Sequence, residues 1–142
     1  MHITVRGNDP QDFPALRDLF LAERRQTYTW AAADAFQLQD LDRQTVGETI
    51  LVAKDEHREI VGFISIWEKD RFIHHLYVAS QQQGKGVGKA LLSALPNWPE
   101  HKYTLKCLAL NQNAIAFYRA CGFSQTGSGN GEDGEYIVFQ SN

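Results

Sequence analysis

Apolar and polar positions along the first half of the chain predict one strand, one helix and then three more strands. Ile3-Thr4-Val5-Arg6 alternates apolar and polar residues, as a half-buried strand does. Asp9-Pro10 then suits the start of a helix, with Asp9 as N-cap and Pro10 at the first helical position. Apolar residues recur at helical spacing as far as Phe20, which predicts a helix that runs to about Arg25.

Three apolar runs follow, and short charged turns at 55–59 and 68–71 separate them. The runs are Thr49–Lys54, Ile60–Trp67 and Phe72–Val78. Short polar connections between strands are typical of hairpins, so this region predicts an antiparallel meander.

The second half alternates predicted helices with predicted strands. A helix at 90–95 lies between the strand 72–78 and a strand at 103–109, which favours parallel pairing across a right-handed crossover. A helix at 113–120 ends at Gly122, and strands at 123–128 and 135–140 follow, with a flexible connection at 129–134. We therefore expect an α/β (α+β) fold in which about four helices flank a mixed sheet of six to seven strands. Residues 1–142 read as one domain.

Composition limits the partners that this chain suits. The 142 residues include 14 basic and 17 acidic side chains, for a net charge of −3, so nothing predicts nucleic-acid binding, and a cationic partner would be attracted only weakly. No apolar run approaches a membrane span, and the first residues do not resemble a signal peptide. Cys107 and Cys121 form no CxxC pair, which indicates reduced core thiols in a cytoplasmic protein. Without a Cys/His cluster at ligand spacing, we expect no metal.

The loop between the strand 72–78 and its following helix has glycines at 84, 86 and 88. Such a loop can expose backbone N–H groups at a helix start, where an anion such as phosphate binds. A P-loop would need glycine at Gln83 and a hydroxyl residue at Ala90, and the dinucleotide pattern fails at its third glycine. A glycine-rich turn without a ligand is the alternative. The pattern Gln-x-x-Gly-x-Gly, which begins at Gln83, resembles the pyrophosphate-binding loop of the GNAT acetyltransferases.

A second pattern, Asn111-x-x-Ala114-x-x-Phe117-Tyr118-x-x-x-Gly122-Phe123, resembles the late motif of the same family. Ala114, Phe117 and Cys121 share one helical face, which we expect to pack on the sheet, with Tyr118 at its edge. The two motifs stand in the family's order, and the resemblance extends from Ile3 to Phe139. It is weakest from Gln26 to Gly47.

The resemblance implies direct transfer of an acetyl group from acetyl-coenzyme A to an amine of a small molecule, peptide or protein. Tyr118 would be the general acid that protonates the leaving thiolate. His74 is the candidate general base, although a hydrogen-bonded core histidine is an equal interpretation and ordered water is a further candidate. Because side chains alternate along a strand, we expect His75 to face the other way, beneath a helix or in solvent.

Further site residues are also implied by the resemblance. Main-chain groups of Leu76 and Val78 would bind the pantetheine arm as an added strand does, and Asn111 would hydrogen-bond to it. The pyrophosphate would contact the loop formed by Gln83, Gly84, Lys85, Gly86, Val87, Gly88 and Lys89. Tyr28, Trp30 and Phe36 would wall the acceptor pocket; the alternative is that they are core residues on a short helix.

Dimers are common in this family, so a homodimer is possible. A second interpretation is a degenerate fold that only binds coenzyme A. The presence of Tyr118, Asn111 and all three glycines argues against it.

Overall fold

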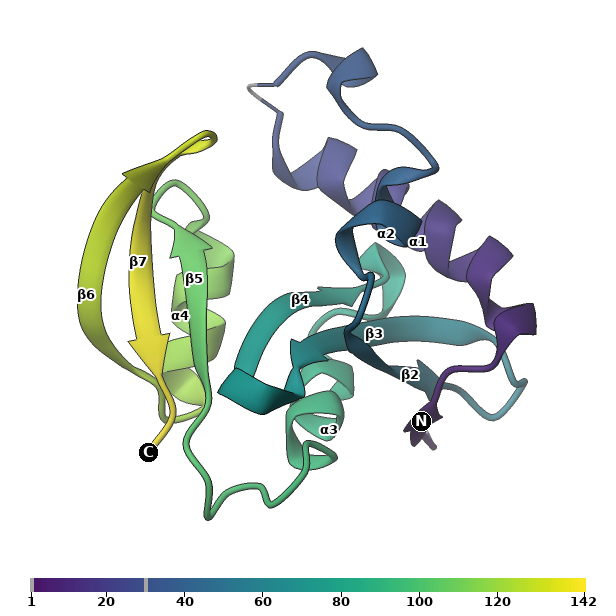
Figure 1. Cartoon of the computed structure of the whole chain (residues 1–142). Helices are drawn as coiled ribbons and strands as arrows, with labels where there is room; N and C mark the ends of the chain where they lie inside the picture. The colour runs from purple at the N-terminus through teal and green to yellow at the C-terminus, as the bar shows by residue number, and fades with distance from the viewer. Residues whose placement is uncertain (1, 30) are drawn as a thin grey trace.

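A seven-stranded mixed sheet forms the centre of the computed structural model, which describes residues 2–29 and 31–142 (Figure 1). The strand order β1-β2-β3-β4-β5-β7-β6 and four flanking helices, counted over these residues, confirm the predicted fold class. The strands are β1 Thr4–Gly7, β2 Thr49–Lys54, β3 Ile60–Trp67, β4 Phe72–Val78, β5 Thr104–Leu108, β6 Ser124–Gly131 and β7 Gly134–Gln140. The α-helices are α1 Phe13–Thr27, α2 Asp40–Gln44, α3 Val87–Ser93 and α4 Gln112–Ala120.

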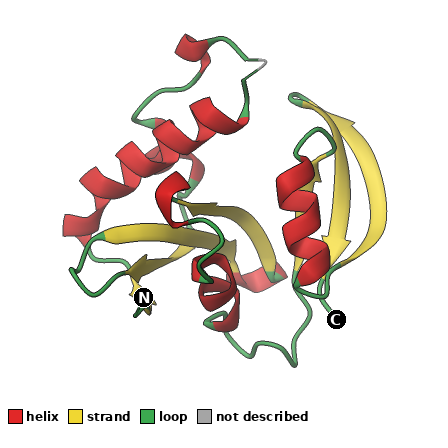
Figure 2. Cartoon of the chain, turned by 180° about the vertical axis from the view of Figure 1, so that it is seen from behind, coloured by secondary structure: helices red, strands yellow, loops and turns green. Residues whose placement is uncertain are grey.

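The sheet is divided between β4 and β5. Strands β1 to β4 form the predicted antiparallel meander, and β5, β7 and β6 form a second antiparallel group. Among the strands of the described residues, β4 and β5 are the only parallel pair, and they are registered at just two positions, Phe72 with Thr104 and Ile73 with Leu105. Beyond Ile73 the two strands diverge, as both views of the ribbon show (Figures 1 and 2).

Each face of the sheet has its own apolar core, because alternate strand residues point to opposite sides. On one face, Leu16 and Phe20 of α1 pack with Leu41 of α2 and with Val52 and Phe63 of the sheet. On the other face, α3 and α4 bury a larger cluster that includes Ile64, Ile66, Leu91, Leu92, Ile115 and Phe139. The helices thus cover both faces of the sheet. In the part of the chain that is described, each helix is too short or too polar to cross a bilayer.

The connection between β6 and β7 differs from the prediction. A flexible segment was expected at 129–134, but β6 continues to Gly131, which pairs with Gly134. Only two residues, Glu132 and Asp133, remain in the turn, and Gly134 takes a positive φ of 117°. Glycine-rich composition was a poor guide here, because the glycines accommodate a tight hairpin.

The helix α4 is also rotated from the expected orientation. Its buried residues are Ile115 and Tyr118, whereas Ala114, Phe117 and Cys121 are only partly buried. These three residues do pack against the core, as predicted, but Ile115 and Tyr118 are buried more deeply, so the prediction that Tyr118 lies at the edge of the packed face was wrong. Tyr118 belongs to the buried face, and the other three border a cleft.

The segment between α1 and β2 is anchored by a buried arginine. The Arg24 guanidinium lies 4.0 Å from the ring centre of Phe20 and 4.5 Å from that of Phe36, and its Nη2 donates to Asp40 at 2.8 Å. A short helix, α2, does occur here, but Tyr28 and Phe36 precede it, so it does not carry core-facing aromatics as expected. Trp30 lies outside the described residues.

We predict that Arg24→Leu lowers the free energy of unfolding by about 3 kcal/mol, because it leaves the Asp40 carboxylate buried with less charge compensation. This is near the low end for a broken buried pair, since Arg43 also contacts Asp40. Urea denaturation measures the change.

Arg17→Leu is the matched control. Arg17 forms an ion pair with Asp42, and the two side chains are 36% and 44% exposed. Because exposed ion pairs contribute little, the free energy of unfolding should hardly change. An equal loss of unfolding free energy in the two variants would contradict the anchoring role of Arg24.

Candidate active site

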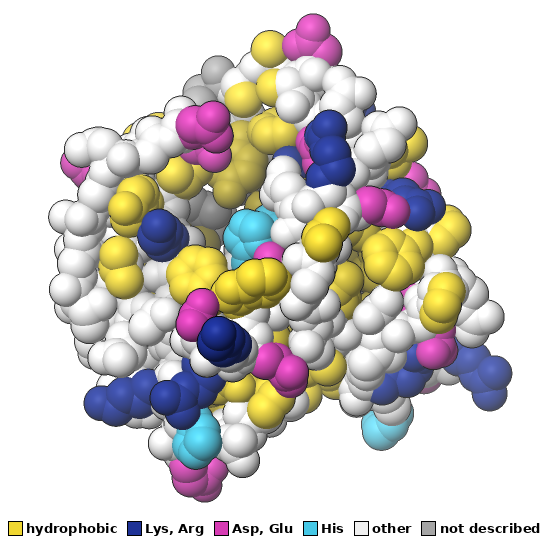
Figure 3. Space-filling view, viewed as in Figure 1, with side chains coloured by type: hydrophobic (Ala, Val, Ile, Leu, Met, Phe, Trp, Pro, Cys, Tyr) yellow, Lys and Arg dark blue, Asp and Glu magenta, His cyan; other side chains and the backbone are white. Residues whose placement is uncertain are grey.

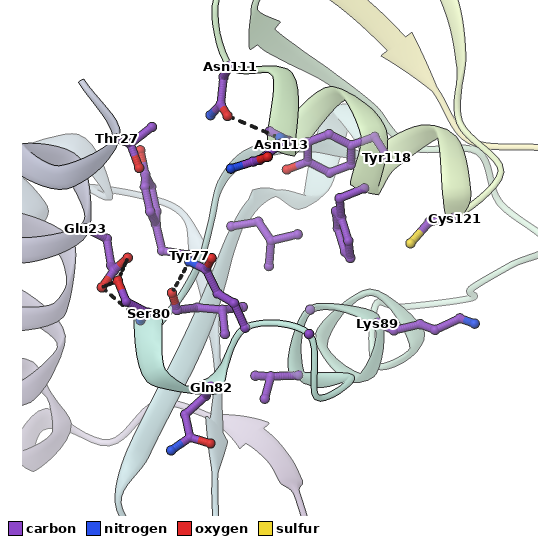
Figure 4. Close-up of a pocket in the computed structure, with 18 of the residues that line it drawn as sticks. Glu23, Thr27, Tyr77, Ser80, Gln82, Lys89, Asn111, Asn113, Tyr118 and Cys121 are labelled. Carbon is purple, nitrogen blue, oxygen red and sulfur yellow. Dashed lines mark hydrogen bonds between the residues drawn. The ribbon is translucent and has the colours of Figure 1, made fainter. Parts of the chain in front are cut away.

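A cleft of about 920 Å³ opens where β4 and β5 diverge. It lies between the C-terminal end of α1 and the glycine loop on one side and α4 on the other (Figure 4). Of the residues predicted to bind the cofactor, those that line it are Leu76, Val78, Gln83, Gly84, Gly86, Val87, Gly88, Lys89 and Asn111, and Tyr118 lines it too. Lys85 is exposed on the same loop but does not line the cleft.

The unpaired edge of β4 forms one wall. Because registered pairing with β5 ends at Ile73, the backbone of Leu76 to Val78 faces the cleft instead of a neighbouring strand. One of its groups is already engaged: the Gln83 side-chain amide donates to the Val78 carbonyl at 3.1 Å. An extended ligand could hydrogen-bond along the rest of this edge as an additional strand does.

Two of the three glycines in the loop have a positive φ and open space beside the backbone, which lets an anion approach the N–H groups. Gly84 and Gly86 have φ angles of 79° and 86°, and a Cβ added at either would meet no atom within 4 Å. The space beside the backbone is therefore open to a ligand. Gly88 has a different role, because a Cβ there would lie 2.8 Å from Cζ of Phe117. It permits close packing of α3 against α4.

Sequence reasoning missed the support beneath this loop. The Ser80 backbone N–H donates to the Glu23 carboxylate at 3.1 Å, and the Ser80 hydroxyl lies 3.0 Å from the same group (Figure 4). Glu23 is buried on α1 and lies 57 residues away along the chain, so no local pattern could reveal the contact. The pair fixes the start of the loop relative to α1.

Tyr118 extends from α4 to the cleft (Figure 4). It is 8% exposed, and its ring packs edge-on against Phe117 and Phe123. Burial raises the pKa of its hydroxyl, with a smaller contribution from Cys107, so the hydroxyl stays protonated at neutral pH. No described residue hydrogen-bonds to this hydroxyl. It is thus placed to donate a proton to a group in the cleft.

Asn111 is positioned by the helix that it begins. Its Oδ1 accepts from the backbone N–H of Ala114 at 3.2 Å, which makes it the N-cap of α4. The amide nitrogen of Asn111 is left for a ligand.

The two histidines of β4 do not alternate. Ser65 pairs with His75 and Ile66 with Ile73, so His74 is the extra residue of a β-bulge. Both rings consequently lie on one side of the strand, stacked with centroids 3.9 Å apart. The prediction that they face opposite ways was wrong, because a bulge shifts the register by one residue.

Neither histidine lines the cleft. His74 is exposed, and its Nδ1 lies 2.5 Å from Oε2 of Glu48. His75 packs edge-on against Phe20 of α1, as the prediction of a position beneath a helix anticipated. Burial, with smaller contributions from His74 and Arg24, lowers the pKa of His75 to about 3, so it is neutral.

Tyr28 and Phe36 lie on the same face of the sheet as these histidines. Their ring centroids are 5.9 Å apart, and the Tyr28 hydroxyl lies 3.4 Å from that of Tyr77 on β4. Neither residue lines the cleft. Figure 3 shows a hollow on this side of the molecule where apolar side chains surround a histidine.

Comparisons with known proteins agree with this geometry. The model of the acetyltransferase (GNAT) family matches residues 13–123. Escherichia coli (strain K12) peptidyl-lysine N-acetyltransferase YiaC is 38% identical over 86% of this chain, which spans 66% of the length of YiaC. An aminoglycoside N(6')-acetyltransferase type 1 from Stenotrophomonas maltophilia is 30% identical, with 87% of each chain covered.

Solved structures share the fold. The apo form of YjaB from Escherichia coli superposes with a TM-score of 0.79 at 23% identity, over 99% of this chain and 97% of YjaB. The PaiA N-acetyltransferase of Thermoplasma acidophilum, solved in complex with coenzyme A, has a TM-score of 0.77 at 16% identity, over 100% of this chain and 99% of PaiA.

We predict that Gly86→Val weakens coenzyme A binding roughly 10- to 100-fold, because the side chain fills the open space and removes at least one hydrogen bond to a charged phosphate. Isothermal titration calorimetry measures the dissociation constant. Gly134→Val is the matched control for backbone strain, since Gly134 also has a positive φ and open surroundings but is the first residue of β7, away from the cleft. Equal weakening in both variants would exclude the loop as the binding site.

Proposed function

Because this chain belongs to the acetyltransferase (GNAT) family, we propose that it transfers the acetyl group of acetyl-coenzyme A directly to an amine. The observation that carries this proposal is the cleft in which the glycine loop, the unpaired edge of β4 and Tyr118 meet. The seven strands form one sheet, so residues 1–142 act as one acetyltransferase domain. The unpaired cysteines suit the reducing cytoplasm.

The cleft suits the two chemically distinct parts of coenzyme A. The N–H groups around Gly84 and Gly86, at the start of α3, would hold the pyrophosphate, and Lys89 adds positive charge. The backbone of Leu76 to Val78 would bind the amide-bearing pantetheine arm. Acetyl-coenzyme A contributes the activated thioester, and a backbone N–H of β4 would polarise its carbonyl.

Tyr118 is the proton donor in this proposal. When the carbon–sulfur bond breaks, the Oη proton of Tyr118 passes to the departing thiolate. Its buried position and raised pKa ensure that the hydroxyl still carries that proton at neutral pH. The thiol formed has a pKa near ~8.5, so protonation favours its departure.

His74, held by Glu48, is our candidate for the group that accepts the proton of the attacking amine. A carboxylate hydrogen-bonded to one ring nitrogen fixes the tautomer and leaves the other nitrogen as the acceptor. His74 lies on the face that carries Tyr28 and Phe36, so the amine would enter from the hollow on that face and the thioester from the cleft. Ordered water is the alternative proton acceptor.

The acceptor is a small-molecule amine or an amine of a peptide or protein. Two relatives at 30% identity or more are named for peptidyl-lysine and for aminoglycosides, both of which carry basic amines. A panel of aminoglycosides, polyamines and lysine peptides, assayed by thiol release from acetyl-coenzyme A, tests the proposal. Binding of coenzyme A without amine-dependent thiol release for any of them would favour a binding protein instead.

We predict that Tyr118→Phe lowers kcat by ~10²–10⁴-fold, because the ring and its packing remain while the proton donor is lost. Steady-state assays measure kcat, and calorimetry should show unchanged affinity for coenzyme A. The deficit should shrink with an acyl donor whose leaving thiol is more acidic. An unchanged kcat, with chemistry shown to be rate-limiting, would remove Tyr118 from the mechanism.

We predict that Tyr28→Leu raises KM for the amine and leaves coenzyme A affinity nearly unchanged, because Tyr28 belongs to the acceptor side and not to the cleft. KM values for the two substrates separate the effects. Parallel losses for both substrates, together with a lower melting temperature, would assign Tyr28 to the core.

A further inference from the structure

Glu48, His74 and His75 form a compact cluster outside the coenzyme A cleft. Glu48 directly precedes β2, and the two histidines lie in the middle of β4. One possible ligand atom from each residue lies within 4.8 Å of those of the other two. The cluster depends on the bulge at His74, because regular alternation would direct the two rings to opposite faces.

Two polar atoms of this cluster are buried without a partner. The Glu48 side chain is 8% exposed and His75 is 9% exposed. Glu48 uses Oε2 for His74, but neither its Oε1 nor Nε2 of His75 has a hydrogen-bond partner among the described residues. A buried polar atom without a partner destabilises the fold, so two of them within one cluster point to a bound group that satisfies both.

The donor set is that of a transition-metal site. Two imidazoles and one carboxylate suit Zn²⁺, whose bonds to such ligands are about 2.0–2.2 Å long. A tetrahedral ion with these bond lengths needs donor atoms about 3.3 Å apart. The present separations lie within 4.8 Å, so ion binding would have to bring the donor atoms closer together. The carboxylate also supplies negative charge, which favours a bound cation.

We propose that Glu48, His74 and His75 bind Zn²⁺ with one coordination position open, and that the bound ion inhibits the acceptor half of the reaction. His74 is 39% exposed, so the fourth position would be accessible from the surface. A metal on His74 occupies the nitrogen lone pair that would accept a proton from the amine. The inhibitory part rests on the proposed function; metal binding itself does not.

The sequence offered little sign of this site. Glu48 is 26 residues from His74, and adjacent histidines are not a usual ligand spacing. The bulge and the β2–β3–β4 meander bring the three side chains together.

The test uses the whole chain without a histidine tag. Titration with zinc chloride, followed by calorimetry, should give one ion per chain, and cobalt chloride should give a tetrahedral Co²⁺ absorption spectrum without a thiolate charge-transfer band. Removing a residue that only supports a metal ligand weakens metal affinity about 10–100-fold, and removing a ligand itself should cost at least as much. Each of the variants Glu48→Gln, His74→Asn and His75→Asn should therefore weaken zinc binding at least about tenfold. His57→Asn, in the exposed β2–β3 turn, is the matched control and should bind as the parent does.

Glu48→Gln keeps the shape of the side chain, so it remains informative if His75→Asn fails to fold. Equal zinc affinity in Glu48→Gln, His57→Asn and the parent would overturn the site, as would a spectrum with cysteine ligands. If the ion binds at the cluster, zinc should lower kcat for acetyl transfer to the amine, because the proton acceptor is blocked, and leave coenzyme A affinity unchanged. Tight binding at the cluster with unchanged kinetics would overturn the inhibitory role, and binding without any acetyl transfer would count against the proposed function and not against the metal site.

Discussion

The separation of β4 from β5 is the constraint on which the rest of this structure depends. Two registered pairs hold these strands together at Phe72 and Ile73, and beyond them each strand follows its own antiparallel group. A continuous sheet would satisfy the β4 backbone and leave no cleft. Because the strands diverge, α4 approaches α3 from the far side of the gap, and Gly88 makes room for Phe117 at that contact. The cleft is therefore a consequence of sheet topology, and contacts such as that of Gly88 with Phe117 set the positions of the helices that border it.

The sequence was sufficient to predict most elements and the position of the glycine loop. The meander, α3, β5 and α4 have strong local periodicity, and the positive φ angles at Gly84 and Gly86 follow from the residue type. The two cofactor-side motifs thus led to residues that do line one cleft. Each of these patterns depends on residues that lie close together in the sequence, within about one strand or one helix.

The predictions that failed concern features that local pattern does not determine. The orientation of the β4 histidines depends on a bulge opposite Ser65, and the rotation of α4 depends on which side of it meets the divided sheet. The β6–β7 turn looked flexible because glycine suits both loops and tight hairpins. The hydrogen bond between Arg24 and Asp40, which are 16 residues apart, links α1 to α2, and the periodicity of the sequence between them could not predict it.

The two faces of the sheet carry different chemistry, and β4 connects them. Leu76 and Val78 border the cleft that suits coenzyme A, while His75 and Tyr77 pack beneath α1. Tyr77 touches both sides, because it lines the cleft and its hydroxyl reaches Tyr28. Burial and the neighbouring Tyr28 raise the pKa of Tyr77 well above its usual range, so it remains a neutral element of this wall. Direct transfer between two bound substrates requires reacting atoms about 3–3.5 Å apart, so an amine that enters from the acceptor hollow would have to reach the β4 edge where the acyl group is held.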